Sequence, residues 1–178
     1  MGDVLLERSA WRVAGAAVCA AALVAATVQP AAAAGDTGTT FTLTGGTLSV
    51  TVAATATLTA GTTTSASVSG KLGTVTVTDG RTSTTVWSAN ATSTTFTRDA
   101  GATTSTGVSY NAGTITTTGP VVMPLALATA LNGTPAKVAG PAAITGDNTA
   151  SWNPTLTVSL PSNALAGTYS GTVNTSVS

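Results

Sequence analysis

Thr155-Leu-Thr-Val-Ser-Leu160 is the stretch that decides the fold, because apolar and hydroxyl side chains alternate strictly along it. A period of two places all three of its apolar side chains on one face, which is the pattern of a half-buried β-strand. Turn-forming residues follow from Pro161 to Gly167, and the alternation then resumes from Thr168 to Val177. The C-terminal part of the chain therefore predicts a strand, a turn and a last strand.

The same texture continues toward the N-terminus in short segments separated by Gly, Asn and Asp. Leu72 to Thr78 alternates and runs into Asp79-Gly80, a dipeptide typical of tight β-hairpins. Residues 128–148 are rich in Ala, Gly and Pro and fit no regular element well. Further strand-like segments lie at 41–44, 48–52, 53–60, 86–91, 94–97, 108–115 and 121–127. Many short strands at this spacing predict an all-β protein, an immunoglobulin-like antiparallel β-sandwich formed as a single domain over residues 41–178.

Residues 1–34 have the parts of a secretory signal peptide. Two arginines precede an apolar run from Val13 to Val28, and a small-residue A-x-A site follows at Ala32 and Ala34. The run is shorter than the ~20 apolar residues that a membrane-spanning helix needs, so cleavage is favoured over anchoring. The sequence predicts a cleaved signal-peptide helix, a flexible leader at 35–40 and a secreted, extracellular domain without a membrane span.

Composition restricts the chemistry that this domain could perform. The chain has six basic and six acidic residues and no histidine, and its single cysteine, Cys19, lies in the predicted leader. The domain would therefore contain no disulfide, no thiol nucleophile and no imidazole base. The aspartates are widely separated, so we expect neither a metal site nor a cofactor. Zero net charge also disfavours nucleic acid as a partner.

A Ser/Thr-rich disordered stalk is the alternative to a folded domain. Disordered segments usually combine low hydrophobicity with high net charge. This chain has a positive mean hydropathy and no net charge. The composition therefore favours folding.

The few aromatic side chains are the candidates for contact with a ligand or for the core. Trp87, Tyr169 and Phe96 are predicted to lie in the core, since a sandwich commonly buries one Trp and fixes one Tyr hydroxyl near its last strand. Trp152 lies between Ser151 and Asn153-Pro154, which is a turn-like context. Trp152 and Tyr110 are accordingly predicted to reach the surface, where aromatic rings could stack on sugars.

Three segments together resemble the WxL-type cell-surface domain of Gram-positive bacteria. The first joins the strand and Asp-x-Arg turn at 75–81 to Val86-Trp87-Ser88-Ala89 and then to Phe96. The others are 144–161, with Trp152, and 166–173, with a Gly-x-Tyr strand. Ala89 stands at the position of the family's Leu, and Asn174 stands where a second Trp-x-Leu is expected. The resemblance implies a β-sandwich with a non-covalent role at the cell wall.

The leading functional hypothesis is a secreted, non-enzymatic surface protein that associates non-covalently with the cell envelope or with partner proteins. Its partners would be cell-wall polysaccharide or surface proteins. One alternative is the structural subunit of a surface polymer, which would offer an open strand edge to a neighbour. A second alternative is a small glycan-binding module. An enzyme is disfavoured because acid and base groups are so scarce.

Overall fold

The computed structural model describes residues 40–99, 101, 103–124, 126 and 128–178. The predicted leader at 1–34, its cleavage residues Ala32 and Ala34, and residues 35–39 lie outside the described residues. The contacts assign Thr42–Ser178 to one compact unit. Within it, the described residues form β-strands and no helix, and every strand pair is antiparallel. The prediction of an all-β protein is confirmed.

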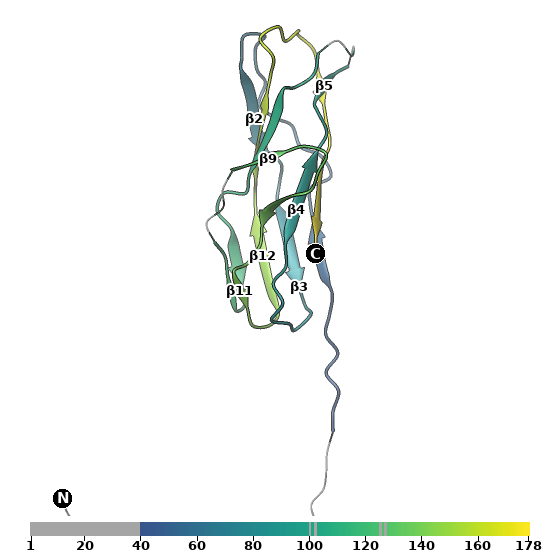
Figure 1. The fold of residues 1–178 in the computed structure, drawn as a ribbon, viewed down its shortest axis with the longest axis vertical. Coiled ribbons are helices and arrows are strands. Elements are labelled where there is room, and N and C mark those ends of the chain that lie inside the picture. The colour runs from purple at the N-terminus through teal and green to yellow at the C-terminus, as the bar shows by residue number, and fades with distance from the viewer. Residues whose placement is uncertain (1–39, 100, 102, 125, 127) are drawn as a thin grey trace, which may run out of the picture. The chain divides into compact units, whose positions relative to one another are not determined.

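The strands are short and fall into five hydrogen-bonded sheets (Figure 1). Their bounds are β1 (Leu48–Thr51), β2 (Ser67–Lys71), β3 (Val75–Asp79), β4 (Ala89–Ser93), β5 (Thr97–Arg98), β6 (Gly107–Asn111), β7 (Thr116–Thr118), β8 (Val121–Val122), β9 (Ala128–Leu131), β10 (Ala136–Ala139), β11 (Ala143–Ile144), β12 (Asn148–Trp152), β13 (Thr155–Ser159), β14 (Tyr169–Ser170) and β15 (Val173–Val177).

The two larger sheets are joined because three long strands run through both of them. Three pairs of strands that are consecutive in the chain each place one strand in either sheet. β3, β7 and β12 lie in the sheet β1-β3-β12-β7, and their chain neighbours β2, β6 and β13 lie in the sheet β2-β13-β6-β9. The residues at 148, 150, 152, 154, 156 and 158 are all buried. The period of two therefore continues from β12 into β13, which makes them one strand with a kink at Asn153-Pro154.

The kink has a local cause. Proline has no N–H for the sheet ladder. The neighbouring chain supplies other bonds here: the Leu72 N–H donates to the Pro154 carbonyl over 3.0 Å, and the Gly73 N–H donates to Asn153 Oδ1 over 3.2 Å. Gly73 has a φ of 91°, a conformation that favours glycine. The interruption between β2 and β3 thus faces the interruption between β12 and β13.

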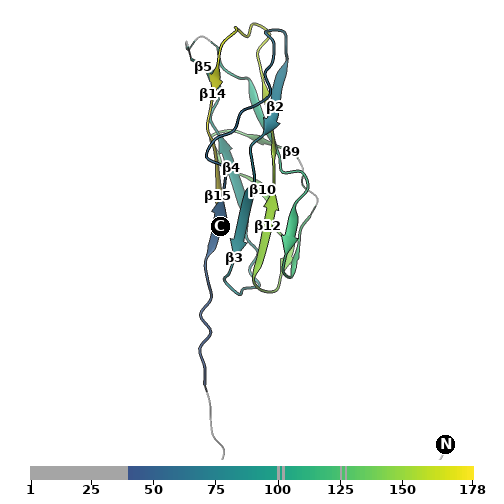
Figure 2. The same ribbon diagram turned by 180° about the vertical axis from the view of Figure 1, so that it is seen from behind.

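A second, smaller layer also consists of two sheets that are linked by consecutive strands (Figure 2). β4 lies between β10 and β15, and β5, which follows β4 in the chain, pairs with β14, which precedes β15. β4 and β15 contribute to the same core as β3 and β12, with Ala89 and Ala91 buried against it and Val173 and Val177 packed at its margin. The two layers of strands around one core give a sandwich-like arrangement.

The structure corrects the hairpin expected at Asp79-Gly80 and some of the expected strand positions. Asp79-Gly80 does not close a hairpin, because β3 pairs with β1 and β12 whereas the next strand, β4, pairs with β10 and β15. The Asp79 side chain bonds to Arg81 instead, and the chain crosses to the second layer. Residues 128–148, which fitted no element, contain β9, β10 and β11, and segment 53–60 lies outside the strands.

Candidate binding groove

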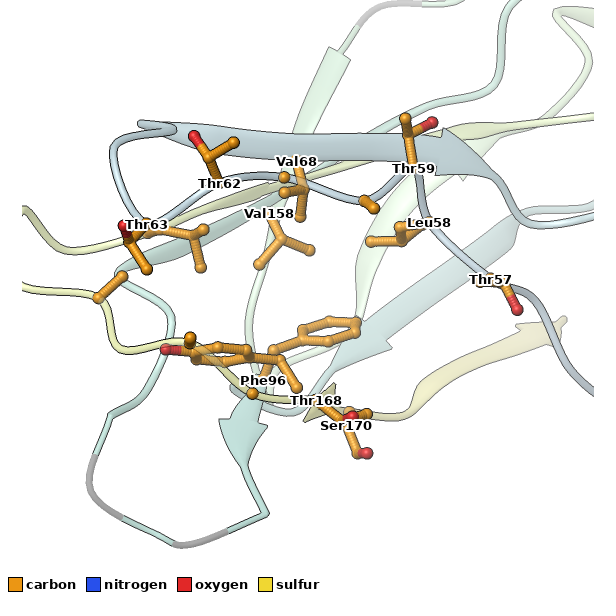
Figure 3. Close-up of a pocket in the computed structure, with 18 of the residues that line it drawn as sticks. Thr57, Leu58, Thr59, Thr62, Thr63, Val68, Phe96, Val158, Thr168 and Ser170 are labelled. Atoms are coloured by element: carbon orange, nitrogen blue, oxygen red, sulfur yellow. The ribbon is translucent and has the colours of Figure 1, made fainter.

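An open groove of ≈ 790 Å³ separates the loop at 56–63 and the adjoining strands from residues 164–171 (Figure 3). The loop and the two neighbouring strands β2 and β13 contribute Leu58, Val68 and Val158. Phe96, Thr168 and Ser170 lie on the opposite side. The volume falls within the range of ~300–1,000 Å³ that small-ligand sites commonly have.

The groove is open because the second layer narrows at this end. β2, β13, β6 and β9 form a four-stranded sheet here, but the strands opposite, β5 and β14, are only two residues long. Val68 and Leu58 are consequently half-buried, whereas Val77, on the continuation of β2, is fully buried. The apolar faces of two elements are thus left without full cover.

A smaller cavity of ≈ 280 Å³ adjoins the groove and shares four of its lining residues, Ala56, Leu58, Phe96 and Gly171. A Cβ atom at Gly171 would lie 2.8 Å from the Phe96 ring, which is closer than real contacts allow. Glycine therefore lets the Phe96 ring lie against the backbone between β14 and β15. Phe96 is half-buried and packs against the core as well as lining the groove.

Every side chain that lines the groove is uncharged. Beside the apolar residues there are hydroxyl groups, among them those of Thr57, Thr59, Thr62, Thr63, Thr168 and Ser170. Tyr169 also lines it, and its hydroxyl donates to the Leu165 carbonyl over 2.9 Å. Such a surface can bind by excluding water from apolar groups and by hydrogen bonding, without desolvating a charge.

Trp152 and Tyr110, predicted to reach the surface, lie in the core. Their exposed fractions are 3% and 1%, and Trp152 Nε1 donates to the Tyr110 hydroxyl over 2.8 Å. This bond satisfies both polar atoms, so the two rings can be buried together. The prediction of surface contact is wrong, because Asn153-Pro154 is a kink within a long strand rather than an exposed turn.

The hydrogen bond between Trp152 and Tyr110 predicts that substitutions at these two residues have non-additive effects on the free energy of unfolding. We expect Tyr110→Phe to lower the free energy of unfolding by about 1–3 kcal/mol, because Trp152 Nε1 would be buried without an acceptor. Trp152→Phe should cost a comparable amount, and the double variant should cost less than the sum of the two. Chemical denaturation followed by circular dichroism gives the coupling; additive losses would contradict it.

Burial also raises the pKa of Tyr110 to about 12, against an opposing effect of the hydrogen bond from Trp152. The folded state therefore favours the neutral phenol. The stability that this preference contributes is complete below the ordinary pKa of 10.0 and is lost as the pH rises toward about 12. In the Tyr110→Phe variant this part of the alkaline destabilisation should be absent.

The other aromatic residues named from the sequence have separate positions. Trp87 is fully buried, and its Nε1 donates to Asn148 Oδ1 over 3.1 Å. Tyr169 is half-buried and lies outside the central cluster of buried residues. Tyr169 and Phe96 meet at the groove, whereas Trp87 lies away from the residues that line it.

A buried polar cluster holds the end of β3 to the start of β12. Asp79 is 1% exposed and accepts from Arg81 Nε over 2.8 Å and from Arg81 Nη2 over 3.0 Å. Asn148 faces Asp79 in the strand register, and its Nδ2 donates to the Gly146 carbonyl. The side-chain hydrogen bond from Arg81 holds the pKa of Asp79 below its ordinary value of 3.8, and burial opposes this shift. The cluster is a structural tie between strands and does not line the groove.

Sequence reasoning did not identify the groove residues. Leu58 belongs to a weakly alternating segment, and Val68 is the lone large apolar residue in the small, polar stretch 61–70, so both are expected to face a core. That the opposing layer is too short to cover them depends on the length of β5 and β14, which only the assembled sheets show. The alternating pattern identifies an apolar face but does not say whether another element covers it.

The structure is that of an all-β protein with an open groove lined by uncharged side chains. No cluster of three or more potential metal-ligating side chains occurs among the residues that the structure describes. The same residues contain no helix that is long and apolar enough to cross a membrane. The chain matches no protein-family model, no curated protein and no solved structure.

Proposed function

We propose that this is a secreted, non-catalytic surface protein that associates non-covalently with the cell envelope or with partner proteins, and that the groove is its contact surface. The observation that carries the proposal is the uncharged, partly apolar lining left open between the two layers. Its hydroxyl and aliphatic groups suit a contact that buries apolar surface and forms hydrogen bonds.

The signal-peptide pattern of residues 1–34 supports the extracellular location. We also propose that the sandwich is immunoglobulin-like. Two features support this: Trp87 is buried between the layers, and the Tyr169 hydroxyl bonds to a carbonyl four residues upstream near the last strand. The resemblance to WxL-type domains points in the same direction, toward the cell wall.

The glycan-binding alternative has lost the residues on which it rested. Trp152 and Tyr110 are buried, so neither ring is available to stack on a sugar. Tyr169 is the remaining aromatic side chain with a polar group at the groove, and its hydroxyl already donates to Leu165. The subunit alternative, in contrast, is supported by two exposed apolar side chains, Phe41 and Leu43, which precede β1.

Retention on cell-envelope material tests the proposal. We expect the protein to co-sediment with native cell walls, and Val68→Arg to lower the bound fraction at least tenfold, because a charge would enter an apolar lining. Val122→Arg is the matched control, since Val122 is exposed on β8 and does not line the groove. Walls stripped of protein distinguish a polysaccharide partner from a protein partner.

Two outcomes would contradict the proposal. One is that the unmodified protein remains entirely in the supernatant with both kinds of wall. The other is that Val68→Arg and Val122→Arg bind as well as the unmodified protein. Circular dichroism of both variants checks that any loss of binding is not a loss of folding.

A further inference from the structure

We propose that the groove receives residues 40–44 of a second copy of this chain, so that copies join head to tail. The inference deepens the proposed function, because it names an occupant for the groove. It rests on four observations: two exposed apolar side chains before β1, an uncharged groove, the distance between them within one copy, and an open strand edge.

The inserting segment is Thr40-Phe41-Thr42-Leu43-Thr44. Phe41 is 87% exposed and Leu43 is 74% exposed, and these are the two most exposed large apolar side chains in the described part of the chain. They alternate with threonines, so an extended backbone places the side chains of Phe41 and Leu43 on the same face. A segment with this pattern is suited to add as a strand and insert two apolar side chains.

The groove complements this segment in chemistry. Leu58, Val68 and Phe96, which are half-buried, provide apolar contacts for Phe41 and Leu43, and the threonine hydroxyls at the margin of the groove resemble those of the segment itself. Neither surface carries a charge, so docking would bury apolar area without desolvating an ionised group. A charged polymer would gain no partner here.

The segment cannot reach the groove of its own copy. Gly46 N–H donates to the Gly80 carbonyl, so the chain before β1 begins beside the end of β3. Asn148 faces Asp79 at this end, whereas Val158 faces Val68 in the groove, ten residues further along β12 and β13. At ~3.3 Å per residue this is about 33 Å, but Phe41 lies only five residues from Gly46 and can span about 17 Å.

An intermolecular contact of this kind joins two different surfaces, so it builds a ring or an open chain of copies rather than a two-fold symmetric dimer. The inserting segment leaves one end of the strands and the groove lies at the other, so each copy has one segment to give and one groove to fill. β14 pairs only with β5 among the described strands, and residues 168–171 line the groove. The backbone of β14 is therefore available to bond with an incoming strand.

The test measures the assembly state of the protein. The full chain is expressed in a secreting host, so that the predicted signal peptide can be removed during export. Sedimentation velocity should show concentration-dependent growth beyond a dimer. Phe41→Ser combined with Leu43→Ser should raise the dissociation constant at least ~100-fold, because burial of each side chain contributes about a factor of ten or more. The matched control is Val86→Ser with Val122→Ser, two exposed apolar residues outside the groove, which should change it by only about twofold.

A mixing experiment tests the direction of the contact. The Phe41→Ser, Leu43→Ser variant keeps a groove but has no inserting side chains, and Val68→Arg keeps the segment but has a blocked groove. Each should be monomeric alone, and an equimolar mixture should stop at a 1:1 dimer. If Val68→Arg does not fold, the substitutions at Phe41 and Leu43 still decide the matter, since both side chains are exposed.

A monomer throughout the concentration range, or assembly that survives loss of Phe41 and Leu43, would overturn the inference. The proposed function would then be judged separately by wall retention. A monomeric protein that binds walls and loses binding in Val68→Arg would keep the groove as a contact surface while excluding a second copy as its occupant.

Discussion

Trp87→Ala should lower the free energy of unfolding by about 3–5 kcal/mol, the usual cost of removing a large aromatic side chain from a core. Trp87 is 0% exposed and belongs to the single cluster of buried residues that both layers share. Truncation would leave a cavity between the layers. It would also leave Asn148 Oδ1 without the N–H that now donates to it over 3.1 Å.

The two contributions can be separated. Trp87→Phe retains most of the apolar volume but loses the N–H, so it should cost about 1–3 kcal/mol. Val86→Ala is the matched control, because Val86 is the preceding residue and is exposed; its effect should stay within about 0.5 kcal/mol. Urea denaturation followed by far-ultraviolet circular dichroism is suitable, since it does not depend on indole fluorescence. A loss below about 1 kcal/mol in Trp87→Ala would show that Trp87 does not hold the layers together.

The size of this effect matters because single domains are only marginally stable, by about 5–15 kcal/mol. The described chain has no histidine or cysteine, so neither a disulfide nor a metal–imidazole site supports the core. Its buried side chains are mostly small, and several positions in β4 and β12 are alanine. The three buried rings of Trp87, Tyr110 and Trp152 are therefore the largest contributors of apolar contact in this core, and truncating any of them removes much of it.

The sequence alone predicted the class of fold because the signal is local. Alternation from Thr155 to Leu160 and from Leu72 to Thr78 identified β13 and β3, since a period of two belongs to one strand at a time. Pairing depends on contacts between distant segments. A hairpin at Asp79-Gly80 is therefore expected from the sequence but is not formed. The Arg81 side chain donates hydrogen bonds to the Asp79 carboxylate, and the chain then crosses to another sheet.

Trp152 shows a second limit of sequence reasoning. Its neighbours Asn153-Pro154 are common in turns, but here the buried residues at 148–158 continue with a period of two through that dipeptide. The partner that makes burial possible, the Tyr110 hydroxyl, lies 42 residues away. Neither this bond nor the uncovered faces of Leu58 and Val68 has a local pattern that could reveal it.

Asp79→Ala should lower the free energy of unfolding at neutral pH by about 2–4 kcal/mol. The substitution removes an acceptor that takes two side-chain hydrogen bonds and one backbone hydrogen bond from Arg81. Hydrogen bonds to charged groups contribute about 1.5–3 kcal/mol each, and the loss is reduced here because the Arg81 side chain is 29% exposed and water can solvate it. Asp99→Asn, which changes an exposed carboxylate, is the control for removing one negative charge.

The same cluster predicts how stability depends on pH. Because Arg81 holds the pKa of Asp79 below 3.8 in the folded state, the unfolded chain binds the proton more readily. The stabilisation from this pair is therefore complete above the ordinary pKa and is lost as the pH falls through the lower, folded-state value. Asp79→Asn keeps the shape of the side chain but has no charge to titrate, so its free energy of unfolding should fall less steeply below about pH 4. Parallel acid-side slopes for the unmodified protein and Asp79→Asn would mean that the ion pair contributes nothing to acid stability, and that the strand ends are held by Asn148 and the backbone alone.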